Sequence, residues 1–71
     1  MKLSEALEGK EYIVTKIETD DEELNAFLFS LGLYSGEPVS VISKRKSGLV
    51  LSIKDARYNI DHALADAILV G

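Results

Sequence analysis

Four interior glycines divide this sequence into short segments: Gly9, Gly32, Gly36 and Gly48. Glycine adopts backbone angles that other residues reach only at a cost, so glycines at such intervals indicate turns and helix ends. The chain has 71 residues and no cysteine, so a hydrophobic core must hold it together without disulfides or thiolate metal ligands. We therefore expect one small domain over residues 1–71, built from short elements and tight turns.

One segment has the apolar spacing of an amphipathic helix. Apolar residues recur at i, i+3, i+4 and i+7, at Leu24, Phe27, Leu28 and Leu31. The helix is expected to end at Gly32, whose left-handed backbone would form a Schellman motif with Leu33 packed back on Leu28. This pattern predicts that the apolar face of the helix covers one end of a strand barrel.

The acidic run before this helix has two interpretations. Thr19 with Glu22, or Asp20 with Glu23, can form a capping box, and acidic residues suit the positive end of a helix dipole. Alternatively, the run could attract Fe²⁺ or another divalent metal weakly through the carboxylates of Glu18, Asp20, Asp21, Glu22 and Glu23. Because side chains around one helical turn diverge, capping is the favoured interpretation, and no tightly bound cofactor is expected.

Five segments rich in β-branched and other apolar residues predict β-strands. They are Tyr12–Ile17, Val39–Ser43, Leu49–Ile53, Arg57–Ile60 and Ala67–Val70. Val14 and Ile17 are both candidates for the core at a spacing of three, which predicts a bulge near Thr15 or a strand that is apolar on both faces. Asp61 can cap a short helical turn through Ala65. Together these elements predict a small closed β-barrel, since closure removes exposed strand edges.

Two residue patterns cover most of the chain. The first is Leu24-x-x-Phe27-Leu28-x-x-Leu31-Gly32-Leu33-x-x-Gly36-x-x-Val39-x-Val41-Ile42, and the second is Arg57-x-x-Ile60-x-x-x-Leu64-Ala65-x-x-Ile68-x-Val70. With the opening Leu3-x-x-x-Leu7-x-Gly9, they resemble the FeoA family. The resemblance implies a mainly β fold, a small SH3-like β-barrel of about five strands with one inserted amphipathic α-helix and a short C-terminal helical turn. Ser35 departs from the family pattern, because many relatives have proline before the turn glycine.

The same resemblance implies a function. FeoA-like proteins belong to ferrous iron uptake, where they accompany the membrane transporter FeoB with its cytoplasmic GTPase domain. It therefore implies a non-enzymatic cytoplasmic accessory protein that binds or regulates a FeoB-like transporter. The domain also occurs in metal-dependent repressors of the DtxR type, but a repressor needs a DNA-binding domain, which these 71 residues do not contain.

The residues most suited to binding a partner are an off-face aromatic and the loop after it. Phe29 lies about 100° around the helix from Leu28 and outside the core arc, so either the following loop covers it or it joins an exposed apolar patch. Tyr34 is its expected neighbour. The predicted partner-binding residues are Phe29, Leu33, Tyr34, Ser35 and Gly36, with Lys44, Arg45 and Lys46 at the tip of a β-hairpin as an additional contact.

Charge and composition exclude several kinds of partner and function. The net charge of −4 disfavours nucleic acid as a partner, and no apolar stretch approaches the ~20 residues needed to span a bilayer. No nucleophile, acid and base form a catalytic set. Two other functions stay open: a metal-binding or metal-sensing domain that uses His62 and Asp66, and a homodimerisation module, or weak homo-oligomer, that buries Phe29 against a second copy.

Overall fold

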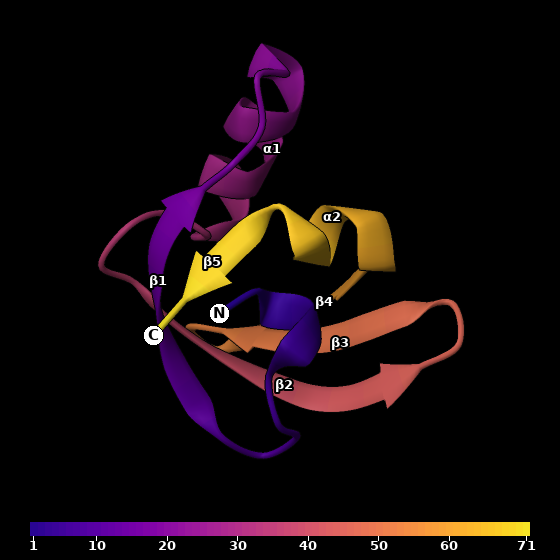
Figure 1. The fold of residues 1–71 in the computed structure, drawn as a ribbon. Coiled ribbons are helices and arrows are strands. Elements are labelled where there is room, and N and C mark those ends of the chain that lie inside the picture. Colours follow the sequence, from indigo (N-terminus) through magenta and orange to yellow (C-terminus); the bar gives the residue numbers. More distant parts are fainter.

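Short strands separated by tight turns form one strongly curved five-stranded antiparallel sheet (Figure 1). The computed structural model describes residues 1–71. The strands lie in the order β4-β3-β2-β1-β5 and the core fills the concave side of the sheet. The elements in chain order are η1 (Leu3–Glu5), β1 (Glu11–Ile17), α1 (Glu22–Leu31), β2 (Pro38–Arg45), β3 (Gly48–Ile53), β4 (Ala56–Ile60), α2 (His62–Asp66) and β5 (Ile68–Val70). The mainly β, barrel-like fold expected from the sequence is confirmed.

The barrel is not closed by hydrogen bonds, which corrects the prediction of a closed barrel. Strands β4 and β5 are the two edges of the sheet and do not pair with each other. Instead α2 connects them, and η1 packs against α2 and β5. The outer edge of β5 is occupied by the N-terminal residues, because Val70 N donates to Met1 O at 2.8 Å and Lys2 bridges to Leu69. The chain start thus covers the β5 edge, one of the two edges that closure would have removed.

Strand β1 carries the bulge that the sequence indicated. Its pairing with β5 shifts between Val14 and Lys16, so Thr15 is the extra residue. The bulge lets Val14 lie in the core and Ile17, three residues later, pack against it from the same side. A second shift, in the pairing of β2 with β3, occurs between Val41 and Ser43.

Helix α1 begins with a cap that differs from both predicted capping boxes. The N-cap is Asp21, whose carboxylate accepts hydrogen bonds from Glu23 N at 3.0 Å and Leu24 N at 3.1 Å. Thr19 instead accepts from Asp21 N at 3.2 Å, which orients the chain before the helix. The sequence has several capping residues in a row, and the structure uses the one that follows both predicted caps, Thr19 and Asp20.

Asp21→Ala should lower the free energy of unfolding by about 1 kcal/mol, because two amides at the start of α1 lose their acceptor. Asp20→Ala is the matched control, since Asp20 is exposed and does not cap the helix. Urea unfolding followed by circular dichroism measures both. Equal losses in the two variants would show that general charge, not the cap, sets the effect.

The end of α1 matches the predicted Schellman motif. Leu33 N donates to Leu28 O at 2.9 Å and Gly32 N donates to Phe29 O at 3.0 Å. Gly32 has φ of +97°, which favours glycine. Leu33 and Leu28 are both buried in the core. The motif reverses the chain direction directly after the helix.

The position of α1 contradicts the expectation that it covers the end of the barrel. Figure 1 shows α1 projecting away from the sheet, with only its C-terminal end reaching the barrel. Of the predicted core face, Leu28 is fully buried, Leu24 and Leu31 are partly buried, and Phe27 is 49% exposed. The core volume is filled instead from the N-terminal segment by Leu3 and Ala6, both completely buried.

Two tight turns complete the sheet. Lys46 and Ser47 alone connect β2 to β3, because Lys44, Arg45 and Gly48 belong to the paired strands. Thus the predicted hairpin is present, with a shorter loop than expected. At the far end of β3, Lys54 and Asp55 lead into β4, and Lys54 has a positive φ of 56°.

The short helix α2 starts as predicted. The carboxylate of Asp61 accepts from Leu64 N at 2.7 Å and caps α2.

Candidate protein-binding surface

The exposed aromatic of α1 pairs with the loop residue expected beside it. The rings of Phe29 and Tyr34 stack with their centroids 4.6 Å apart and their planes inclined by 29°. Phe29 nevertheless stays 64% exposed. Lys54 Nζ lies 5.7 Å from the centre of the Tyr34 ring and 3.5 Å from its hydroxyl, which is a cation–π distance and the long limit of a hydrogen bond. We call Phe29, Tyr34 and Lys54 the aromatic patch.

Gly32 brings the parts of the aromatic patch together. Its left-handed turn reverses the chain, so that Tyr34 returns beside Phe29. It also lies against the β3–β4 turn: a Cβ on Gly32 would be 3.0 Å from Ile53 Cγ2 and 3.5 Å from Lys54 Cε. A glycine is therefore needed here both for its backbone angle and for the close approach that places Lys54.

The loop residues predicted to bind a partner separate into exposed and buried ones. Tyr34 is half-buried, and Ser35 and Gly36 are exposed. Gly36 N donates to Val14 O at 2.8 Å, which holds the loop against β1. Leu33 is only 1% exposed and belongs to the core, so its side chain is not available to a partner. Its assignment to the surface is wrong because the Schellman motif turns Leu33 inward.

The hairpin tip does not join the aromatic patch. Lys44, Arg45 and Lys46 lie where β2 meets β3, whereas Lys54 follows the other end of β3. Six residues of strand separate these ends, a length of about 20 Å. The cation beside the aromatic pair is Lys54, which was not among the residues predicted from the sequence. Its only sequence signal was its place in a turn, which does not say what lies beside it.

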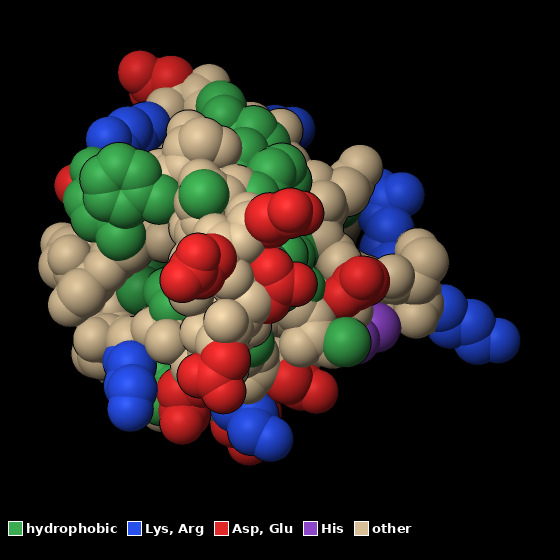
Figure 2. All heavy atoms as spheres, turned by 90° about the horizontal axis from the view of Figure 1, so that it is seen from above, with side chains coloured by type: hydrophobic (Ala, Val, Ile, Leu, Met, Phe, Trp, Pro, Cys, Tyr) green, Lys and Arg blue, Asp and Glu red, His purple; other side chains and the backbone are tan.

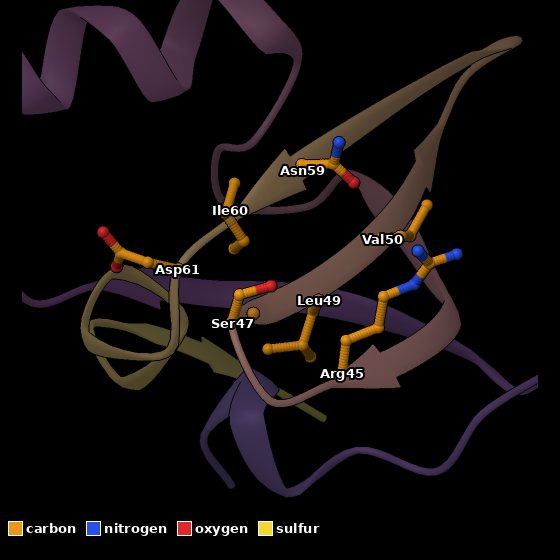
Figure 3. Close-up of a pocket in the computed structure, with 8 residues that line it drawn as sticks. Arg45, Ser47, Leu49, Val50, Asn59, Ile60 and Asp61 are labelled. Carbon is orange, nitrogen blue, oxygen red and sulfur yellow. The ribbon is translucent and has the colours of Figure 1, made fainter.

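A hollow lies next to the hairpin tip (Figure 3). It has a cavity volume of about 260 Å³, and Figure 3 shows Arg45 and Asn59 on either side of Val50. Ser47 is the only nucleophilic side chain in the lining, and no histidine or lysine accompanies it. The Asp61 carboxylate is engaged in the cap of α2. The lining therefore lacks a nucleophile with a positioned base, the arrangement that covalent catalysis requires.

The two residues proposed for a metal each have another partner. His62 Nε2 is 2.7 Å from Arg45 O, so this nitrogen carries the proton and donates to the carbonyl. Asp66 accepts a hydrogen bond from the Ser4 hydroxyl. The structure contains no group of three or more His, Cys, Asp or Glu side chains that could hold a metal ion. His62 and Asp66 therefore tie α2 to β2 and η1 in this conformation.

Comparison of the sequence with protein families decides the family. The model of the FeoA domain matches residues 1–71. This chain belongs to the FeoA domain family. The family is linked to ferrous iron transport. A search of curated proteins gave no significant match.

Solved structures place this FeoA domain among proteins of the same fold. An iron uptake regulatory protein, FeoA, is 28% identical with a TM-score of 0.88, over 99% of this chain and 93% of that one. The zinc complex of FeoA from Stenotrophomonas maltophilia, described as a prokaryotic SH3 domain protein, is 21% identical with a TM-score of 0.87, over 100% and 89%.

A manganese-dependent transcriptional repressor is 22% identical with a TM-score of 0.88, and this chain spans 40% of its length. At such identities the likeness to the S. maltophilia protein and to the repressor concerns the fold. In this FeoA domain, no helix has the length and apolar character needed to cross a membrane.

Proposed function

We propose that this FeoA domain is a non-enzymatic, cytoplasmic accessory protein of ferrous iron uptake that docks on the GTPase domain of a FeoB-like transporter through the aromatic patch. Family membership supports the pathway. The observation that carries the docking surface is the stacked pair of Phe29 and Tyr34, in which Phe29 remains 64% exposed.

The geometry of the patch suits protein binding. Aromatic side chains that are already held in one conformation bury a large area at little cost in conformational entropy. Here stacking fixes Phe29 against Tyr34, and the hydrogen-bonded turn at Gly32 fixes the loop. Lys54 adds a positive charge at the edge of the apolar area, which favours a partner surface with an aromatic or aliphatic group beside a carboxylate.

Phe29→Ala should weaken binding to a purified FeoB-like GTPase domain by at least about tenfold, since an aromatic at the centre of an interface commonly contributes more than about 1.4 kcal/mol. Titration of the ¹⁵N-labelled protein measures the affinity and maps the surface. Amide shifts should concentrate at Phe29, Tyr34 and Lys54.

Leu7→Ala is the matched control, because Leu7 is also 64% exposed but lies in the N-terminal segment. Wild-type affinity is expected for this variant. The surface assignment is overturned if the labelled protein shows no shifts at the aromatic patch, or if the Phe29 and Leu7 variants bind equally well.

A further inference from the structure

A second surface lies on another side of α1, where a groove separates the start of this helix from α2. Its cavity volume is about 310 Å³. The apolar part of the lining comes from one residue of α1 and from α2 with its C-terminal neighbour: Leu24, Ala63, Leu64 and Ala67. Leu24 and Leu64 are only partly buried, so an apolar floor faces solvent. We call this site the α1–α2 groove.

The α1–α2 groove has an acidic rim. Glu18 and Asp61 line it together with Thr19, and the lining contains no lysine or arginine. Further carboxylates, at 20–23, lie in the first turn of α1 and just before it, outside the lining itself. Figure 2 views this side of the molecule and shows Asp and Glu side chains gathered across it, with Lys and Arg at the margins. The apolar floor thus has two carboxylates at its rim and lies on an acidic side of the molecule.

We infer that the α1–α2 groove binds a basic apolar segment of a partner protein, which inserts an aliphatic side chain onto the floor while flanking lysines or arginines meet the rim. Charge complementarity selects this occupant. A second copy placed on the same groove would bring carboxylates against carboxylates, and nucleic acids or anionic lipids would be repelled. A basic amphipathic helix has the required combination of an apolar face and cationic flanks.

The groove is separate from the aromatic patch. Leu24 and Phe29 are five positions apart on α1, which places them about 140° apart around the helix axis. Because α1 projects from the barrel, both sides are open to partners (Figure 1). The positive charge of Lys54 also distinguishes the aromatic patch from the acidic groove. This binding site therefore goes beyond the proposed docking on a transporter and does not depend on it.

The probe for this site is a fluorescein-labelled helical peptide of 14 residues, about two heptads, with leucines on one face and lysines on the other. Fluorescence anisotropy measures its affinity. Glu18→Lys should weaken binding at least about tenfold, because it reverses a charge on the rim. Glu11→Lys makes the same change in net charge at the exposed start of β1 and should leave affinity within about twofold.

Shift mapping on the wild-type protein tests the apolar floor without a variant that could unfold. Amide shifts caused by the leucine–lysine peptide should concentrate at Ala63, Leu64 and Ala67, and Phe29→Ala should bind the peptide normally. A peptide with glutamate in place of lysine should not bind. The inference fails if Glu18→Lys and Glu11→Lys weaken binding equally, if the shifts fall outside the groove, or if the leucine–lysine peptide does not bind.

Discussion

Leu28→Ala should lower the free energy of unfolding by about 3 kcal/mol and release α1 from the barrel. Leu28 is completely buried and is the only α1 residue that is. Removing a buried leucine side chain costs about 2–5 kcal/mol, because apolar contacts are lost and a cavity remains. The other core contacts of α1, Leu24 and Leu31, are only partly buried, so Leu28 is the main anchor of the helix.

Urea unfolding of Leu28→Ala and Phe27→Ala compares the stability contributed by the buried Leu28 with that contributed by the exposed part of the helix face. Phe27→Ala removes a larger side chain, but Phe27 is 49% exposed and its loss should cost under about 1.5 kcal/mol. Amide spectra of the leucine variant should also show altered signals at Phe29 and Tyr34, since their stacking depends on the helix end. If Phe27→Ala costs as much as Leu28→Ala, then α1 packs along its whole apolar face, as its periodicity predicted.

The contrast between Leu28 and Phe27 shows what apolar periodicity in a sequence can and cannot predict about a helix. Spacing identified the helix and the arc on which Leu24, Phe27, Leu28 and Leu31 lie. It could not say which part of that arc meets the sheet, because the direction of a helix axis is set by tertiary contacts. Leu3 and Ala6 are core residues that apolar spacing did not predict. They lie in and beside a single 3₁₀ turn, which is too short to show a periodic pattern.

Local signals predicted the turns and the bulge more reliably. The Schellman motif at Gly32 and the cap at Asp61 depend on residues within one turn of each other, and both are present. The Thr15 bulge followed from two core residues at an odd spacing. The cap of α1 lies one or two residues after the predicted ones because Thr19, Asp20 and Asp21 can each cap a helix that starts directly after it.

The candidate site was predictable only where its residues are close in sequence. Only the C-terminal end of the helix lies between Phe29 and Tyr34 in the sequence. An aromatic outside the core face, followed by a turn that reverses the chain, was therefore enough to predict that the two rings are neighbours. Lys54 comes from a distant turn, and only the sheet brings it there. The basic residues at 44–46 were grouped with the patch by charge alone, whereas β3 holds them at the opposite end.

Both proposed surfaces depend on the way α1 stands on the barrel. One side of the helix carries the aromatic patch with a lysine, and another places Leu24 in the apolar floor of the α1–α2 groove. The exposed ring of Phe29 is not explained by packing within the chain, whereas Leu24 packs partly against the core and leaves the rest of its side chain to the groove. Partners of opposite charge on these two sides could be bound at the same time.

Because β3 lies in close contact with the end of β4, Gly48→Ala should be at least as destabilising as Leu28→Ala. A Cβ at Gly48 would lie 2.1 Å from Ile60 O and 3.0 Å from Ile60 C. These are backbone atoms, so no side-chain rotation can relieve the clash, and the β3–β4 pairing at this end must open. We expect a loss of at least about 3 kcal/mol, most of the stability of a domain this small, and a fall in Tm of more than about 10 °C.

Gly36→Ala is the control that measures the cost of the backbone angle without a steric clash. Gly36 has a φ of +91°, but a Cβ there would meet no atom within 4 Å. Alanine at this position should therefore cost only the strain of a left-handed residue, about 1–2 kcal/mol. Thermal unfolding of both variants should place Gly48→Ala well below Gly36→Ala. Gly48 itself has a φ of +157°, so equal Tm values would mean that the backbone angle, and not the approach of Ile60, is the reason for glycine at position 48.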